Sequence, residues 1–451
     1  MKVRAYLAFI SLVACSWSAL AQQPREKDPA PPEAPVEVQT APAHLGNEAP
    51  GAALETDVER GNILLLGVTG GGAYDNRGLY HSATPPYYSS DTRWFIQPSV
   101  ALRRSFTTGD WTLSYTPGAS FDQEDSGQTQ YTNNFAGDVN LKPNSYWFIH
   151  ARQDVSITDN PFESVGRVDL LPGLGGPFGP NYNGVLPQTK RTSIISSGDI
   201  SYRLAEHTAV GVTGEYEKFD YDDVHTSTGD IQFTNSHVYS GSAFLSKQFS
   251  ETTTAGVQVA WVDVYSTGDQ ASRTQAPAAM VFFKVTPSPH LIFTFYGGPQ
   301  YARTRGVVST ADVVYQHAWY PNVGGTMAWS SGRNAVELQA THRISNGGGL
   351  MDAVKATYAG AGYRARVSER LLLSANVNFS DQKGLGALSG SEKFRSTWVG
   401  GGPTIDLNRS FALRAEVAYV HQSVNDLSTG PGNHALVQGS LEYRFRKHLG
   451  D

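Results

Sequence analysis

The sequence is poor in the residues that stabilise many secreted or nucleic-acid-binding proteins. Its 451 residues include a single cysteine, Cys15, and an intrachain disulfide needs two. Charged residues make up only 17% of the chain, and the formal net charge is −6. A disulfide-stapled fold is therefore excluded, and there is no basic field to attract nucleic acid.

Long apolar segments are also missing. After the first 21 residues no stretch approaches the roughly 18 consecutive apolar residues of a transmembrane helix, and the mean hydropathy is −0.32. Aromatic residues nevertheless reach 11%, and there are 46 glycines. This composition excludes a helical membrane protein and is typical of a membrane β-barrel.

The N-terminus has the pattern of a secretory signal peptide over residues 1–21. A basic start, Met1–Arg4, precedes the apolar stretch Ala5–Ala14, and small residues at Ala19 and Ala21 mark a cleavage site. The sequence before Cys15 also resembles a bacterial lipobox, in which this cysteine would be lipidated and become the first residue. We favour cleavage after Ala21, which leaves a mature protein without cysteine, and we expect export to the bacterial outer membrane.

Residues 22–59 are rich in Pro and Ala and have almost no aromatic side chains. Such a segment cannot build a core, so we predict a disordered periplasmic tether, with a plug or a partner-docking segment as the alternative. Residues 60–451 then form the barrel domain.

From about residue 62 onward, segments with alternating polar and apolar residues come in pairs. In Leu371–Ser380, for example, the odd-numbered residues are apolar and the even-numbered residues are mostly polar. Short turns alternate with long loops between these segments, which is typical of a transmembrane antiparallel up-and-down β-barrel with short periplasmic turns and long extracellular loops. We predict an all-β fold of about 18 strands, with 16 as the alternative. The expected strands begin near residues 62, 93, 111, 130, 146, 190, 208, 236, 254, 275, 290, 314, 335, 353, 371, 394, 411 and 434.

Aromatic residues gather beside the short turns, as expected at a membrane–water interface. They are Phe106, Trp111, Trp147, Phe148, Phe249, Phe283, Phe293, Trp329 and Phe411.

The last predicted strand resembles the assembly signal that the barrel assembly machinery reads in outer-membrane proteins. Its elements here are Gln438, Ser440, Tyr443 and Phe445. Ser440 stands where glycine is usual, and residues 446–451 extend past the customary terminal aromatic. Together with Gly71–Asn76 at the end of the first strand, the overall pattern resembles a family of bacterial outer-membrane β-barrel porins whose substrates are largely unassigned. The resemblance covers the barrel region and implies no catalytic motif.

The side of the strands opposite the apolar face carries charges of both signs. We predict that these residues line the lumen: Arg152, Asp154, Glu337, Arg343, Arg364, Arg366, Arg414 and Glu416. Charges are tolerated there because the lumen is wet, whereas a charge facing hydrocarbon at the midplane costs about 2–4 kcal/mol. They could simply be solvated, or they could create a transverse field that tunes selectivity.

The longest predicted loop runs from about residue 159 to residue 188. Its apolar side chains need a surface to bury against, so we predict that it folds inward and narrows the pore with Glu163, Arg167 and Asp169. An outward-standing surface loop is the alternative.

These features predict a non-enzymatic, porin-like channel for passive diffusion of small polar solutes, embedded in outer-membrane lipid. No cofactor, metal or nucleic-acid partner is expected. The alternatives are a conduit for secretion of a polymer such as an exopolysaccharide, and a structural barrel that does not conduct. The solute, the direction of transport and the oligomeric state are not indicated by the sequence.

Overall fold

The computed structural model describes residues 62–79, 88–122, 129–158, 190–222, 224–226, 229–231, 234–267, 271–307, 313–347, 351–385, 393–424 and 432–449. The predicted signal peptide, the predicted tether and the loop residues Glu163, Arg167 and Asp169 lie outside this described part of the chain. No helix within the described part is long and apolar enough to cross a membrane.

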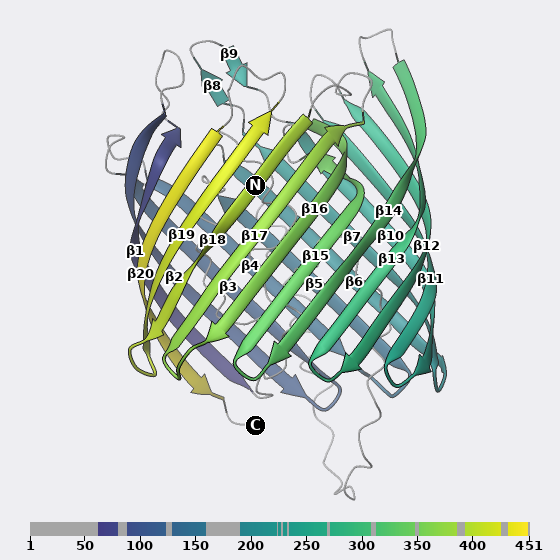
Figure 1. Ribbon diagram of the computed structural model, residues 1–451, viewed down its shortest axis with the longest axis horizontal. Helices are drawn as coiled ribbons and strands as arrows, with labels where there is room; N and C mark the ends of the chain where they lie inside the picture. Colours follow the sequence, from purple (N-terminus) through teal and green to yellow (C-terminus); the bar gives the residue numbers. More distant parts are fainter. Residues whose placement is uncertain are drawn as a thin grey trace, which may run out of the picture. The chain divides into compact units, whose positions relative to one another are not determined.

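Eighteen long strands form one antiparallel sheet that closes on itself (Figure 1). Each strand pairs with its neighbours in sequence, and the ring closes where β1 pairs with β20, from Ile63 opposite His448 to Asp75 opposite Leu436. The ring contains β1 (Ile63–Leu79), β2 (Tyr88–Phe106), β3 (Gly109–Asp122), β4 (Thr129–Leu141), β5 (Trp147–Thr158), β6 (Arg191–Ala205), β7 (Thr208–Tyr221), β10 (Asn235–Ser250), β11 (Thr253–Thr267), β12 (Ser272–Ser288), β13 (Leu291–Val307), β14 (Val313–Ser331), β15 (Asn334–Gly347), β16 (Met351–Arg366), β17 (Leu371–Gly384), β18 (Lys393–Asp406), β19 (Phe411–Val424) and β20 (Gly432–His448).

The strand count predicted from the sequence is confirmed, and the alternative of sixteen is wrong. Every barrel strand begins within five residues of its expected start. A separate two-stranded hairpin of β8 (Val224–Thr226) and β9 (Gly229–Ile231), in the connection between β7 and β10, was not predicted. Its strands of three residues are too short to show an alternating pattern.

The short turns are stabilised by side chains that replace missing backbone partners. The Asn144 side-chain oxygen accepts hydrogen bonds from the backbone N–H groups of Tyr146 and Trp147. Asn408 does the same for Ser410 and Phe411. Local bonds of this kind are why Asn and Ser are favoured in turns.

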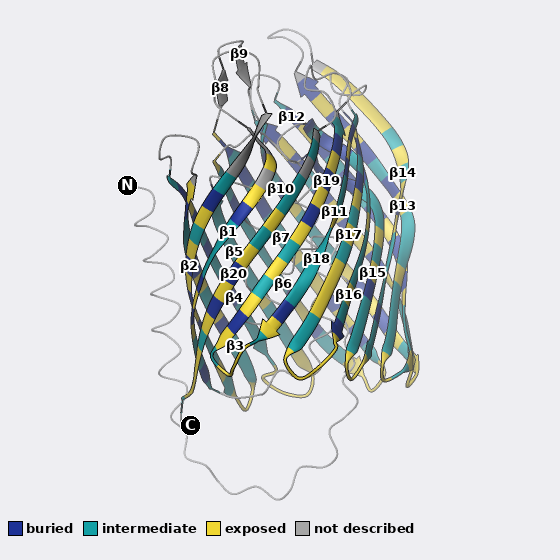
Figure 2. Ribbon diagram, turned by 60° about the vertical axis from the view of Figure 1, so that its left-hand side comes forward, coloured by how far each residue is buried: buried dark blue, intermediate teal, exposed yellow. Residues whose placement is uncertain are grey.

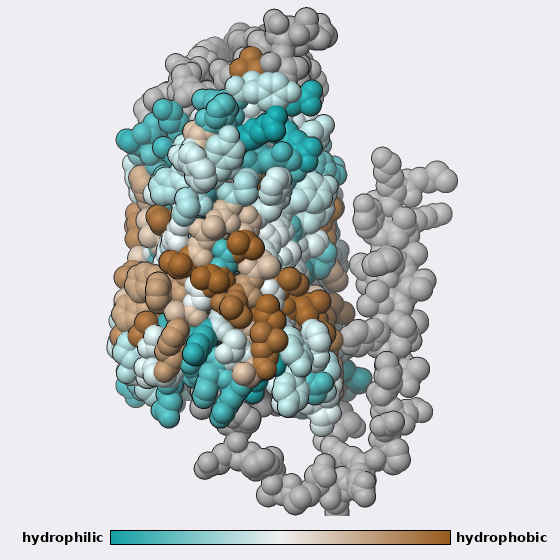
Figure 3. Space-filling view, turned by 90° about the vertical axis from the view of Figure 1, so that its right-hand side faces the viewer, coloured by the Kyte–Doolittle hydropathy of each residue, from teal (hydrophilic) through white to brown (hydrophobic). Residues whose placement is uncertain are grey.

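Exposure alternates along the strands, because successive side chains point to opposite faces of a sheet (Figure 2). In β17, Leu373, Val377 and Phe379 are exposed on the outside, whereas Ser380 on the other face is buried. A brown apolar band crosses the middle of the barrel in Figure 3, with polar surface above and below it. An apolar band that faces outward, with polar groups on the inner face, is the arrangement of a transmembrane β-barrel.

Aromatic side chains flank this band at both ends. At the short-turn end, Trp147 and Phe249 are exposed on the outer face, and Phe411 packs against Tyr443 with ring centroids 5.1 Å apart. The prediction for Phe148 is wrong in one respect: the pairing with buried Ser201 puts its ring on the inner face, 5.7 Å from the Lys142 amine. At the long-loop end, a second girdle includes Tyr216 with Tyr239 and Tyr301 with Trp319, and centroid separations are 5.0 and 5.1 Å.

An arginine placed on the outer face should prevent assembly, whereas one on the inner face should be tolerated. We expect Val417→Arg, in the middle of β19, to be destabilising by about 2–4 kcal/mol, because the charge would face hydrocarbon. Leu373→Arg, which lies closer to the short turn, should be destabilising by less. Asn376→Arg, on the inner face of the same strand as Leu373, is the matched control. The measurement is the fraction of protein in the outer membrane that is folded, read from its heat-modifiable electrophoretic mobility. Equal assembly of all three variants would contradict the assignment of faces.

Candidate functional site

The inner face of β3–β6 is lined almost wholly by polar side chains, and we call it the polar wall. Strand pairing brings the inward residues of these strands side by side, with Asp138 opposite Arg152 and Arg152 opposite Ser197. The wall runs from the short turns toward the long loops and includes Thr112, Thr116, Ser120, Gln130, Thr132, Asn134, Asp138, His150, Arg152, Asp154, Ser156, Ser193, Ser197, Asp199 and Ser201.

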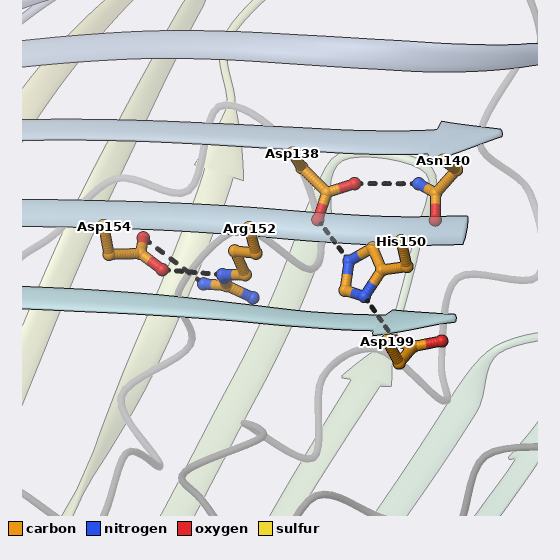
Figure 4. Close-up of polar contacts among 6 residues, drawn as sticks. All are labelled: Asp138, Asn140, His150, Arg152, Asp154 and Asp199. Atoms are coloured by element: carbon orange, nitrogen blue, oxygen red, sulfur yellow. Dashed lines mark hydrogen bonds and ion pairs between the residues drawn. The ribbon is translucent and has the colours of Figure 1, made fainter. Parts of the chain in front are cut away.

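A histidine joins two carboxylates near the short-turn end of this wall (Figure 4). The His150 Nε2 atom lies 2.9 Å from an oxygen of Asp138, and its Nδ1 atom lies 3.0 Å from an oxygen of Asp199. Asn140 donates a hydrogen bond of 2.8 Å to the other oxygen of Asp138. Three neighbouring strands, β4, β5 and β6, are therefore linked through one ring.

Further ion pairs lie on the inner face. Arg152 Nε contacts Asp154 at 2.7 Å, two residues along the same strand (Figure 4). At the short-turn end of β20, Arg444 donates to both oxygens of Glu442 at 2.7 and 2.6 Å. In these pairs each charged side chain lies beside an opposite charge and is held in place by charge-assisted hydrogen bonds. Within the part of the chain that the structure describes, no group of three or more His, Cys, Asp or Glu side chains is arranged to hold a metal ion.

The lumen residues predicted from the sequence all lie on strands at inward-facing positions. Arg152 and Asp154 come together in one ion pair. Glu337 is buried at the wall opposite Ala328 and Gly362. The others occupy inward positions of β15, β16 and β19: Arg343, Arg364, Arg366, Arg414 and Glu416. The eight residues are spread around the ring and do not form one cluster.

The residues of the predicted assembly signal lie in β20. Gln438 and Ser440 face inward, and Tyr443 and Phe445 are exposed on the outer face. The residues after Phe445 continue the strand, since Arg446 pairs with Leu65 and His448 with Ile63. The extension past the terminal aromatic is therefore part of the ring closure.

The upper ends of β15 and β16 separate from β14 and turn into the lumen, while β16 stays paired with β17 as far as Val354 opposite Gly384. We call residues 343–347 and 351–356 the inner hairpin (Figure 1). Ile344 and Ala353 from the hairpin belong to a buried apolar cluster with inward-facing residues of β10–β13. Those partners are Val238, Val262, Val264, Ala276 and Ala302. β16 contacts β11 and β12, although three or more strands separate them around the ring.

Two further contacts show how far the hairpin reaches. Asn346 Nδ2 donates a hydrogen bond of 3.1 Å to Glu217 on β7, with five ring strands lying between β7 and β15. Neighbouring strands are about 4.8 Å apart, so the hairpin crosses a large part of the lumen to bring Asn346 next to β7. On the opposite side of the hairpin, Val354 and Ala356 pack against Phe394 of β18. The inner hairpin therefore narrows the lumen near the long-loop end.

Sequence reasoning did not find the inner hairpin or the apolar patch beneath it. The sequence of β11 did contain a signal, because both faces of this strand are apolar. Val259 and Trp261 lie on the outer face, and Ala260 and Val262 lie on the inner face. A strand that is apolar on both faces is typical of one covered on both sides.

No family model and no curated protein matches this chain. Among solved structures, the ferric citrate transporter FecA matches with a TM-score of 0.41 and 10% identity, over 82% of this chain and 61% of FecA. The ferric-catecholate import receptor Fiu from Escherichia coli K12 matches with a TM-score of 0.43 and 9% identity, over 86% of this chain and 82% of Fiu. The outer-membrane protein OpdK from Pseudomonas aeruginosa matches with a TM-score of 0.39 and 10% identity, over 85% of this chain and 99% of OpdK. At these values the likenesses assign neither family nor substrate.

Removal of the histidine from the polar wall should change ion selectivity. In a His150→Ala variant, Asp138 and Asp199 lose the ring that lies between them, and their charges face the lumen without it. We therefore expect the reversal potential in a KCl gradient to shift toward the potassium equilibrium potential. His421→Ala, on the outer face, is the control and should leave the reversal potential unchanged. Identical shifts in the two variants would mean that His150 does not face the ion path.

Proposed function

We propose that this protein is a passive outer-membrane channel for small polar solutes. A closed ring of eighteen strands supports this proposal, because barrels of 16–18 strands are wide enough to leave an aqueous interior. The apolar outer band and its two aromatic girdles match a lipid bilayer.

The observation that carries the proposal is the polar wall. Burying a charged group without water or a partner is costly, so a wall with Asp138, His150, Arg152, Asp154 and Asp199 fits a water-filled space. The wall lies halfway around the ring from β15 and β16, whose upper ends turn into the lumen from the opposite side. Solutes would therefore pass along the polar wall, beside the inner hairpin.

Export and assembly belong to the same proposal. The predicted signal peptide would direct the chain across the inner membrane, and β20 with Tyr443 and Phe445 would be read by the barrel assembly machinery. The prediction that the loop from about residue 159 to 188 also narrows the pore stays a prediction.

Purified protein in a planar lipid bilayer should produce stepwise, persistent increases in ion conductance, because water fills the space along the polar wall. The folded fraction is verified first by its heat-modifiable mobility, and heat-unfolded protein from the same preparation is the control. Folded protein that inserts into the bilayer without any conductance would contradict the channel proposal and would favour a structural barrel.

A further inference from the structure

The hydrogen-bonded ladder between β14 and β15 is interrupted. It runs from Ser331 opposite Asn334 up to Val323 opposite His342, and stops there. On either side the neighbouring ladders continue, to Val307 opposite Val313 between β13 and β14, and to Gly347 opposite Met351 between β15 and β16. Residues 313–322 of β14 thus form an edge that has no strand partner among the described residues on the β15 side.

Pro321 accounts for the position of this break. It pairs with Pro299 of β13, and two prolines cannot exchange N–H hydrogen bonds. The pair is therefore a non-hydrogen-bonded one, so the amide position of Pro321 points away from β13, toward β15. A donor is missing where the next rung of the β14–β15 ladder would form, and proline in a sheet is confined to such edges.

The inner hairpin could occupy the vacant edge and keep Ile344 in apolar surroundings, and Asn346 and Lys355 would then lie on the outer face near Trp319. If the existing register continued, Ile344 would lie opposite Pro321, and Asn346 opposite Trp319. Ile344 would then face lipid beside the outer aromatic girdle, whereas in the structure it is buried against the inner wall. Ile344 therefore has apolar surroundings in both positions.

The structure also places a link between the two sites. The Lys355 amine, on the hairpin strand opposite Ile344, lies 5.8 Å from the ring of Tyr320 on the free edge of β14. Tyr320 itself packs on the apolar cluster to which Ile344 and Ala353 of the inner hairpin belong. The free edge and the base of the hairpin are therefore neighbours.

We propose that the inner hairpin is a gate with two positions. In the position seen here it packs on β10–β13 and narrows the lumen. In the other position it pairs with residues 313–322 of β14, completes the barrel wall and widens the lumen. The proposal rests on the channel function proposed above, but its structural part can be tested without measuring transport.

Two cysteine pairs can trap the two positions in the full-length protein. Trp319→Cys with Asn346→Cys would lie directly opposite each other in the extended ladder, where the Cα separation of about 5.5 Å allows a disulfide. Glu217→Cys with Asn346→Cys is close in the structure, where the two side chains are hydrogen-bonded at 3.1 Å, and a short bifunctional thiol reagent should join them. Val314→Cys with Asn346→Cys is the control, because Val314 lies five residues, or about 17 Å, further along the edge from Trp319.

We expect the first two pairs to cross-link and the control pair to remain free. The Trp319–Asn346 disulfide should raise single-channel conductance, and a reducing agent should reverse the increase. If the Glu217–Asn346 pair joins while the Trp319–Asn346 pair never oxidises, the hairpin is fixed and the gate is refuted. A disulfide that forms without changing the conductance of a conducting protein would also refute it. Absence of conductance in every variant would refute the channel, and the cross-linking result would still decide whether the hairpin moves.

A proline substitution gives an independent test. Pro321→Val restores an N–H donor on the side of β15, so the Trp319–Asn346 disulfide should form about fivefold faster, the factor that one net backbone hydrogen bond contributes. Pro299→Val restores a donor in the pairing partner, but on the side of β12, and should leave the rate unchanged. Equal rates in both variants would contradict the role assigned to the β14 edge.

Discussion

Backbone hydrogen bonding is the constraint on which this structure depends. A strand that faces hydrocarbon cannot give its N–H and C=O groups to water, so a sheet in a membrane must close on itself. The pairing of β1 with β20 along thirteen residue pairs achieves this closure. The interrupted stretch described above, residues 313–322 of β14, includes Trp319 of the outer aromatic girdle, which lies beside Tyr301. Water and polar groups become available there, so unpaired backbone is less costly than at the midplane.

Closure also divides the strands between two environments. Outward residues such as Leu373 and Val417 face the apolar band, and inward residues of the polar wall are hydrogen-bonded to one another across strands. The inner face is not uniform, because the apolar patch on β10–β13 is covered by the inner hairpin. The lumen therefore has a polar wall on β3–β6 and an apolar patch on β10–β13 that the inner hairpin covers.

The sequence was sufficient to predict the class of fold, the strand number and the facing of most strands. Alternation in segments such as Leu371–Ser380 reports local geometry directly, since a side chain in a strand has only two faces to choose between. The inner hairpin could not be predicted in this way, because Ile344 keeps the same parity whether it faces lipid or the inner wall. Its position depends on contacts with Val262 and Ala302, which are distant in sequence. The cluster around His150 was missed for a similar reason, since Asp138, His150 and Asp199 meet only through the register of three strands.

The central claim, that one side of the lumen is wet and the other is covered, can be tested most directly by the rate of cysteine modification with a charged, water-soluble thiol reagent. Cleavage after Ala21 would leave the mature chain without a native cysteine, so single substitutions would report individual positions. A cysteine at Ser197, on the polar wall, should react quickly, whereas a cysteine at Ala276, fully buried beneath the inner hairpin, should react much more slowly. Similar rates at the two positions, or protection of Ser197→Cys, would contradict this account.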